Sequence, residues 1–219
     1  MMPQRFDLIV FDWDGTLYDS TALIARCTQA AAADLGLPVP SQKLATHVIG
    51  LGFYDALRQV VPDLPRERYG ELGQRFRHHF IAAQDELSLF EGTVEMLRSL
   101  KARHHWLAIA TGKSRRGLDE VLQDEALKGL FDGSRTADET AGKPHPQMLL
   151  ELMREFGAEP ERTLMIGDTS HDLQLAQNAG TASVAVSYGA HEVCEFAAFA
   201  PLHTAHSVAD LQQWLLANA

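Results

Sequence analysis

The sequence predicts an α/β fold in which a doubly wound parallel sheet carries an inserted helical cap domain. Three observations lead to this prediction. Short apolar runs continue without alternation, as in strands that are covered on both faces of a parallel sheet. Segments with helical periodicity lie between these runs, which is typical of α/β domains. Residues 20–84, which follow the first run, contain no convincing strand pattern.

Five runs of the sequence are candidate strands. Four are continuously apolar and short, as buried strands are, and they are bounded by polar or turn-forming residues. The fifth, at residues 133–136, is weaker because it carries polar side chains. The apolar runs are residues 8–11, 106–110, 164–166 and 184–186.

Three helices are predicted between these strands. Residues 93–102 and 146–156 carry apolar side chains at helical spacing. Pro146 suits the first turn of a helix, because its missing N–H would have no partner there. Residues 172–179 end at Gly180, a residue that readily adopts the left-handed conformation of a helix end.

The alternation of strands and helices stops after the first strand and resumes near residue 90. Helical patterns fill the interval, at residues 21–35, 53–61 and 66–83, and Ser20 is positioned to cap the first of them. We therefore expect an α/β core domain of residues 1–17 and 90–219, and a helical cap domain of residues 18–89.

The charge of the chain limits its partners. With 19 Lys+Arg and 29 Asp+Glu among 219 residues, the formal net charge is −10. This balance argues against broad nucleic-acid binding, which depends on basic side chains at phosphates. A small phosphorylated ligand needs only a local positive site. The predicted insertion, residues 20–84, is itself slightly basic, with seven Lys+Arg and five Asp+Glu.

The sequence also predicts where the protein works. It has two cysteines, Cys27 and Cys194, far apart in the chain, which is no disulfide framework. The apolar run at residues 8–11 is too short for a secretory signal or a membrane span. We expect a cytoplasmic protein without a membrane partner, and a monomer in the absence of long apolar stripes on the cap helices.

Polar residues follow three of the predicted strands, at the sheet edge where α/β proteins bind ligands. Several carboxylates that lie close together at this edge would destabilise the fold unless a cation neutralised their charge. Oxygen ligands with open positions favour Mg²⁺. The residues concerned are Asp12 and Asp14 after the first strand, Thr111 and Gly112 after the second, Asp168 and Asp172 after the third, and Lys143 before a helix.

The spacing of Asp12 and Asp14 suits phosphoryl transfer. A carboxylate nucleophile at Asp12 would divide the transfer into two steps through an acyl phosphate. A second carboxyl group at Asp14 would protonate the leaving oxygen and then activate water. Thr111, the Gly112 amide and the Lys143 ammonium would stabilise the charge that spreads over the phosphoryl oxygens.

Four motifs together resemble the haloacid dehalogenase superfamily, in the order of that family. They are DWDGTLYDS at residues 12–20, ATGK at 110–113, GKPHP at 142–146 and GDTSHD at 167–172. The resemblance covers the whole predicted core and is greatest to the phosphoglycolate phosphatase-like branch. It implies a five-stranded sheet in the order 5-4-1-2-3, and a helical insert of the family's C1 cap type.

The resemblance also implies a role for each motif residue in a Mg²⁺-dependent phosphotransferase. Asp12 would be the nucleophile and a metal ligand, and Asp14 the general acid and base, with its backbone carbonyl on the metal. Asp168 would be a further metal ligand, and Asp172 would act on the metal indirectly. Thr111 and Lys143 would bind phosphate. Dehalogenases of the superfamily lack an equivalent of Asp14, which favours phosphate chemistry here.

The substrate would be a small phosphomonoester, of the phosphoglycolate or sugar phosphate type. In the cap, His47 and Arg58 are candidate substrate contacts. Lys113 and His171 are expected beside the site without contacting phosphate or metal. Three alternatives stay open: a phosphosugar mutase of the β-phosphoglucomutase type, a pyrophosphatase of the same branch, and a non-catalytic phosphate-binding module.

Overall fold

A six-stranded parallel sheet forms the centre of the larger part of the protein. The computed structural model describes residues 5–219, so residues 1–4 of the predicted core segment lie outside the described residues. The sheet order is β3-β2-β1-β4-β5-β6. The strands are β1 (Leu8–Phe11), β2 (Trp106–Thr111), β3 (Gly133–Thr136), β4 (Thr163–Gly167), β5 (Ala182–Val186) and β6 (Thr204–Ala205).

The predicted order 5-4-1-2-3 is confirmed for the first five strands, but the predicted count of five is wrong. The sixth strand, β6, adds to the outer edge of β5 through the pairs Ala185↔Thr204 and Val186↔Ala205. Only two residues long, β6 has no apolar run that a sequence pattern would reveal.

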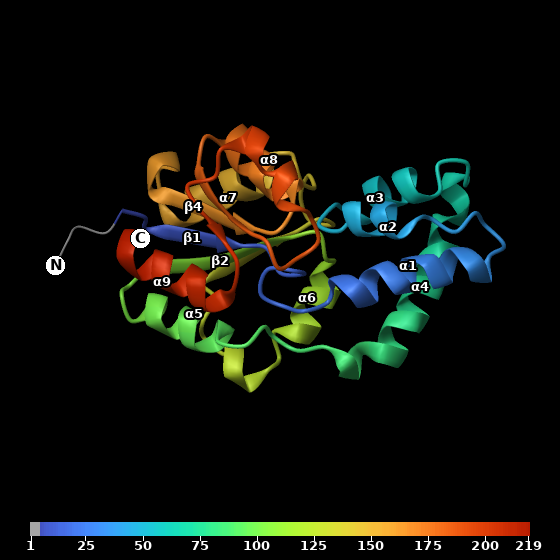
Figure 1. Cartoon of the computed structure of the whole chain (residues 1–219), viewed down its shortest axis with the longest axis horizontal. Coiled ribbons are helices and arrows are strands. Elements are labelled where there is room, and N and C mark those ends of the chain that lie inside the picture. The colour runs from blue at the N-terminus through green and yellow to red at the C-terminus, as the bar shows by residue number, and fades with distance from the viewer. Residues whose placement is uncertain (1–4) are drawn as a thin grey trace.

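Both faces of the sheet are covered by helices. In β1, Ile9 and Phe11 pack on one face with residues of α5 and α9, whereas Leu8 and Val10 pack on the other with residues of α7 and α8. Figure 1 shows these helix pairs on opposite sides of the strands. This double burial explains the continuous apolar runs. The helices of this part are α5 (Thr93–Lys101), α6 (Arg115–Val121), α7 (Gln147–Phe156), α8 (Ser170–Ala179) and α9 (Val208–Asn218).

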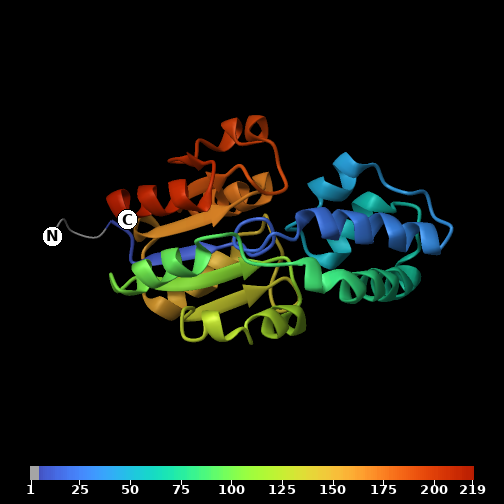
Figure 2. The same ribbon diagram turned by 60° about the horizontal axis from the view of Figure 1, so that its bottom comes forward.

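The inserted segment folds into helices that lie beyond one edge of the sheet, away from both termini (Figures 1 and 2). These helices share a hydrophobic cluster of their own, which includes Leu51, Leu57, Tyr69 and Leu72. The predicted helix at 66–83 is divided, because a short 3₁₀ turn (Arg66–Arg68) precedes its main part. The helices are α1 (Thr21–Asp34), α2 (Gln42–His47), α3 (Phe53–Val60) and α4 (Tyr69–Ala83).

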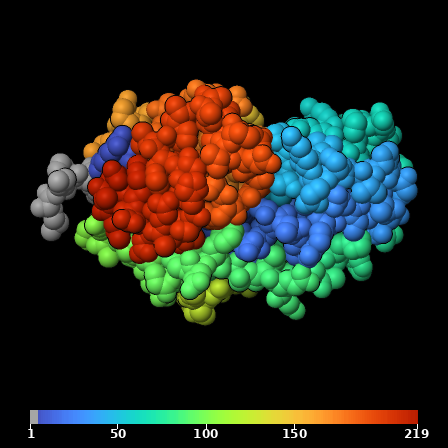
Figure 3. All heavy atoms as spheres, viewed as in Figure 1, coloured from blue at the N-terminus to red at the C-terminus, as the bar shows by residue number. Residues whose placement is uncertain are grey.

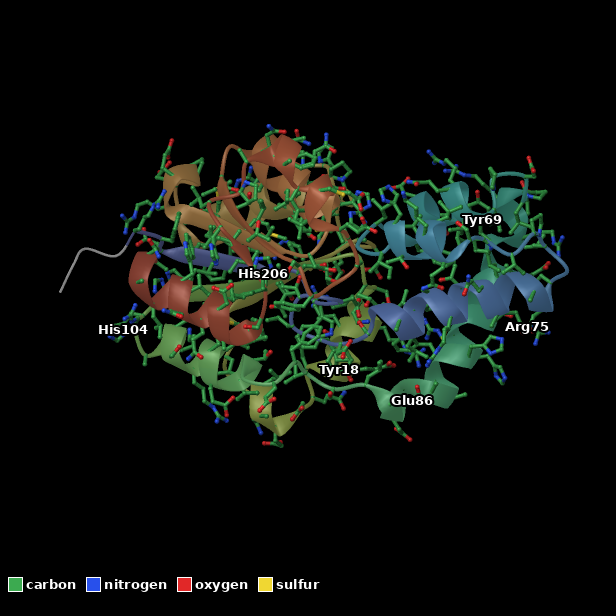
Figure 4. The ribbon with its side chains drawn as sticks, in the orientation of Figure 1. Tyr18, Tyr69, Arg75, Glu86, His104 and His206 are labelled. Atoms are coloured by element: carbon green, nitrogen blue, oxygen red, sulfur yellow. The ribbon has the colours of Figure 1, made fainter. Side chains whose placement is uncertain are left out.

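The two connections between the insertion and the sheet run side by side. An antiparallel bridge joins Tyr18 to Leu89, and the Asp19 amide donates to the Ser88 carbonyl at 2.9 Å. Figure 4 shows Tyr18 at this junction. In the space-filling view the inserted helices and the sheet domain meet along a continuous seam (Figure 3). Within residues 5–219, no helix combines the length and apolarity needed to cross a membrane.

Candidate active site

The residues of the predicted site come together where the parallel strands end, on the side of the sheet that faces the insertion (Figure 2). Asp12 directly follows β1, Thr111 is the last residue of β2, and Asp168 directly follows β4. Because β1 pairs with both β2 and β4, these three positions are neighbours at one edge. Lys143 reaches the same place from the loop before α7, and all four side chains are buried.

Asp12 is the centre of this cluster and is 1% exposed. Its Oδ1 lies 2.7 Å from Nζ of Lys143, whereas its Oδ2 has no hydrogen-bond partner among the described residues. Burial raises the pKa of Asp12 well above its ordinary value, although the Lys143 ammonium opposes the shift. A buried oxygen without a partner is costly, so Oδ2 is suited to contact a cation or a substrate.

Lys143 bridges two carboxylates, since its Nζ also lies 2.6 Å from Oδ1 of Asp172. Burial alone would lower the pKa of Lys143, but Asp12 and Asp172 more than offset this effect, and the pKa lies above its ordinary value. The ammonium is therefore charged at neutral pH. Oδ2 of Asp172 accepts hydrogen bonds from the amide and hydroxyl of Thr169, in a capping box at the start of α8.

Asp168 is held by two donors. The Thr16 hydroxyl donates to its Oδ1 at 2.8 Å, and the Ala190 amide donates to its Oδ2 at 2.7 Å. Burial, together with the nearby charge of Asp172, raises the pKa of Asp168 to about 7. Carboxylate oxygens of Asp12, Asp168 and Asp172 lie within 4.8 Å of one another. This set, with the unpartnered Asp12 Oδ2, fits a Mg²⁺ ion, which prefers a few carboxylates and keeps open positions.

The Asp14 carboxylate faces two donors that the sequence patterns did not reveal. Ser20 is at the N-cap position of α1, as predicted, but its hydroxyl makes no capping bond and donates to Oδ1 of Asp14 at 2.6 Å. Lys113 donates to the same oxygen at 3.0 Å, and its Nζ lies 5.4 Å from the ring centre of Phe80 in α4. Lys113 is thus beside the site, as expected, and is paired with a predicted catalytic residue.

The loop between α2 and α3 covers the cluster. Gly50 has a φ of +90°, and a Cβ built on it would lie 3.3 Å from Oγ1 of Thr169 and 4.0 Å from Oδ2 of Asp12. A Cβ on Gly112 would lie 2.5 Å from the Leu51 carbonyl oxygen and 2.7 Å from that of Gly50. Only glycine at position 112 lets the inserted loop approach so closely.

A pocket of about 500 Å³ opens beside this loop. Arg58, one of the two predicted cap contacts, lines it together with Asp55, 4.0 Å away. The loop that contains Lys143, residues 142–146, lines the pocket on the side of the sheet domain. The pocket therefore joins the inserted helices to the loop that carries a predicted phosphate ligand.

His47, the other predicted cap contact, does not line this pocket. It packs against His171 and His191, and its carbonyl oxygen accepts from Nε2 of both rings, at 2.8 and 3.0 Å. Burial lowers the pKa of both His171 and His191. His191 follows β5 and no sequence motif marks it; its one signal is that it comes after a strand at the same sheet edge.

Known proteins resemble this chain in sequence and in fold. A family model described as haloacid dehalogenase-like hydrolase matches residues 9–186. Among curated proteins, IndB of Dickeya dadantii, named a probable phosphatase, is 34% identical over 199 residues, which covers 89% of this chain and 86% of that protein. The phosphoglycolate phosphatase of Aliivibrio fischeri is 35% identical over 197 residues, with 86% and 87% covered.

A solved structure from Bacteroides vulgatus, whose assignment as a β-phosphoglucomutase is itself provisional, superposes with a TM-score of 0.85. The superposition covers 99% of this chain and 91% of the Bacteroides vulgatus chain, and the two sequences are 21% identical. At this identity the likeness shows the fold alone.

Proposed function

The chain belongs to the haloacid dehalogenase-like hydrolase family, and we propose that it is a Mg²⁺-dependent phosphatase that cleaves a small phosphomonoester through an aspartyl-phosphate intermediate. It is a phosphoric monoester hydrolase of the phosphoglycolate phosphatase-like branch. The observation that carries the proposed mechanism is the buried, unpartnered Oδ2 of Asp12. A neighbouring ammonium, that of Lys143, contacts the other oxygen of the same carboxylate.

Mg²⁺ is the proposed cofactor. Asp12, Asp168 and the backbone carbonyl of Asp14 would hold it, and when bound it neutralises charge on the carboxylates and the phosphoryl oxygens. Asp172 acts indirectly in this proposal, because its oxygens are already engaged by Thr169 and Lys143.

In the first half of the reaction, Oδ2 of Asp12 attacks phosphorus. The new oxygen–phosphorus bond forms as the bond to the leaving oxygen breaks, and Asp14 in its protonated form gives that oxygen a proton. Lys143, the Thr111 hydroxyl and the Gly112 amide bind the phosphoryl oxygens and stabilise their charge. Lys143 is already placed for this, 2.7 Å from the nucleophile's other oxygen.

In the second half, Asp14 accepts a proton from water as the water oxygen attacks phosphorus, and the bond between phosphorus and Asp12 breaks. The loop at Gly50 supports this scheme, because it covers Asp12 and limits access of bulk water. Inorganic phosphate then leaves, and Asp12 returns to its free state.

The pocket beside Lys143 supports a small substrate. Its volume of about 500 Å³ suits a metabolite, and Arg58 and Asp55, 4.0 Å apart, place one positive and one negative charge in its wall. We propose that residues 18–89 act as a cap that selects the substrate, with Arg58 as a contact and His47 in a supporting position. Phosphoglycolate and sugar phosphates remain the proposed substrate classes.

We propose that the protein is a monomer and that it works in the cytoplasm. The two free cysteines, one of them exposed, are in keeping with that compartment.

A phosphosugar mutase is the second candidate, because a mutase of this superfamily would use the same four motifs. Such an enzyme returns the phosphoryl group to a sugar and not to water. A non-catalytic module is a poorer candidate, because Asp12, Asp14, Thr111, Lys143 and Asp168 are all present and gathered at one edge.

A substrate screen tests the proposal. Purified protein is incubated with Mg²⁺ and a panel that includes phosphoglycolate, hexose phosphates and nucleoside monophosphates, and released phosphate is measured. The isosteric variant Asp12→Asn is the matched control. We expect release from at least one small monoester, lost in the variant and on chelation of Mg²⁺. Interconversion of two sugar phosphates without phosphate release would favour the mutase. Hydrolysis by the variant would exclude Asp12 as nucleophile.

A further inference from the structure

Three histidine side chains meet at the seam between the inserted helices and the sheet domain. His47 ends α2, His171 lies in the first turn of α8, and His191 follows β5. The ring centres are 4.8 Å apart for His47 and His191, 5.0 Å for His171 and His191, and 5.3 Å for His47 and His171. One nitrogen from each ring lies within 4.8 Å of the others. The proposed phosphatase reaction uses none of the three.

His171 and His191, the two histidines of the sheet domain, both direct Nε2 at the carbonyl oxygen of His47. Nε2 of His171 and Nε2 of His191 lie 2.8 and 3.0 Å from the carbonyl oxygen of His47. The His47 ring stacks on His191 with an angle of 9° between their planes. The carbonyl oxygen and the ring of His47 thus lie beside these two Nε2 atoms, at a place between two parts of the chain that are more than 100 residues apart.

A carboxylate stands behind two of the rings. Oε2 of Glu195 lies 3.5 Å from Nδ1 of His47 and 3.7 Å from Nδ1 of His191. In metal sites, a ligating histidine usually donates the N–H of its other nitrogen to a carboxylate, a carbonyl or a water, which orients the ring. Glu195 is therefore placed to accept a proton from Nδ1 of either ring when the other nitrogen of that ring binds a cation.

We propose that His47, His171 and His191 form a second metal site, for a divalent cation of the Zn²⁺ type, that bridges the insertion and the sheet domain. Imidazole suits Zn²⁺, whereas Mg²⁺ prefers oxygen ligands, so the two sites differ in the metal they select. Three histidines with a fourth, open position are a known Zn²⁺ arrangement.

Binding requires a limited rearrangement. With Zn–N bonds of about 2.0–2.1 Å, tetrahedral ligand nitrogens are about 3.4 Å apart, so the nitrogens move closer together and the His47 ring turns out of its stack on His191. The half-buried His47 has room to turn. His191 Nδ1 now accepts from the Ser170 amide at 3.0 Å. When Nε2 binds the cation, the ring proton moves to Nδ1 and the hydrogen bond from the Ser170 amide is lost, so the ring turns until Glu195 or the Ser170 hydroxyl, now at 3.2 Å, accepts the proton.

A cation at this place connects α2 directly to α8 and to the loop after β5. It replaces two hydrogen bonds to the His47 carbonyl by bonds to a shared ion. The site depends on these contacts and not on the proposed phosphatase reaction, so it can be tested separately.

The first test measures Zn²⁺ affinity in the full chain. Metal-free protein is supplied with excess Mg²⁺ to fill the carboxylate site, and Zn²⁺ is titrated in competition with a chromophoric chelator. We expect one Zn²⁺ per chain. Glu195→Gln should weaken binding about 10- to 100-fold, and His47→Ala, which removes a ligand, should weaken it more. The exposed His78→Ala is the matched control and should bind like the parent protein.

The second test identifies the ligands with Co²⁺ in place of Zn²⁺. A histidine-ligated tetrahedral Co²⁺ gives strong visible absorption, and we expect this band in the parent protein and in His78→Ala but not in His47→Ala. Circular dichroism and thermal melting confirm that each variant is folded. Absence of Zn²⁺ binding in the presence of Mg²⁺, or equal binding by folded His47→Ala, would overturn the proposal.

Discussion

The Nζ atom of Lys113 lies 3.0 Å from Oδ1 of Asp14. The Ser20 hydroxyl donates to the same oxygen at 2.6 Å. Two donors from different segments thus fix the orientation of the carboxyl group that we propose as general acid and base. Because proton transfer depends on this orientation, both donors bear on the rate of the reaction.

We expect Lys113→Met to lower kcat about 10- to 100-fold, with a smaller change in KM, since the variant loosens Asp14 without removing it. Steady-state kinetics on the substrate found in the screen provide the measurement. Arg116→Met, three residues along and exposed, is the control and should keep the parent kcat. An unchanged kcat in Lys113→Met would show that Lys113 does not position Asp14.

Asp14→Asn should separate the two halves of the reaction. With a substrate whose leaving group departs without protonation, such as an activated aryl phosphate, Asp12 still attacks, but no base activates water. We expect phosphoenzyme to accumulate, seen by intact-protein mass spectrometry as the added mass of one phosphoryl group. The double variant Asp12→Asn/Asp14→Asn should show none. Rapid, complete turnover by Asp14→Asn would contradict its role as base.

Gly112→Ala should prevent the inserted loop from resting on the phosphate-binding segment. The added methyl group would lie 2.5 Å from the Leu51 carbonyl oxygen, so the loop must move away. We expect kcat/KM to fall about 100-fold, as for small displacements near a reacting centre, with little change in the melting temperature. Gly117→Ala, in the neighbouring helix, has space for a methyl group and should remain active.

Lys143→Met should destabilise the metal-free protein, because Asp12 and Asp172 lose the charge that pairs them. Breaking a buried ion pair costs about 3–5 kcal/mol, and Mg²⁺ should restore part of this loss. Urea unfolding with and without Mg²⁺ measures both effects. Lys128→Met, which breaks an exposed pair with Glu125, should cost about 1 kcal/mol or less and should not respond to Mg²⁺.

Acid should destabilise the protein through its buried histidines. Burial lowers the pKa of His105, His171 and His191 in the folded state. At these three histidines the unfolded chain therefore binds more protons below about pH 6.5, so each lowers the free energy of unfolding as the pH falls, by at most about 1.4 kcal/mol per pH unit. Asp12 and Asp168, whose pKa is raised by burial, act in the opposite direction, so the histidine contribution is read from the difference between variants.

The slope of unfolding free energy between pH 7 and 5 tests this effect. His105→Gln should have a shallower slope than the parent protein, whatever its absolute stability. Substitution of the exposed His78 by Gln should leave the slope unchanged. Identical slopes in the parent protein and His105→Gln would show that His105 does not contribute.

The strands of the sheet could be predicted because the pattern that identifies each of them lies within a few consecutive residues. Strands such as β1 and β4 are buried on both faces, so their residues are apolar apart from Thr163 at the start of β4, and the run is visible in the sequence. The edge strand β6 and the short helix α2 are held mainly by what they pack against. Their six or fewer residues carry too little periodicity to be recognised.

The site, too, has residues that the sequence predicts and contacts that it does not. Asp12, Thr111 and Asp168 were predictable because a parallel sheet brings the ends of its strands to one edge. The contact of Lys113 with Asp14 joins positions 99 residues apart, and the meeting of His47 with His191 joins positions 144 apart. Neither contact is encoded by a local pattern, and the second also depends on how the inserted helices rest on the sheet domain.

The paired connections at Tyr18 and Leu89 make the insertion an exchangeable module. Since the chain leaves and re-enters the sheet domain at adjacent, hydrogen-bonded points, a short turn or a different domain would span the same gap at little cost in loop-closure entropy. The same pairing couples the two connections mechanically, so the helices can tilt only by bending both at once. In the function that we propose, substrate choice and chemistry would in this way be divided between two parts of the chain that meet at one pair of connections.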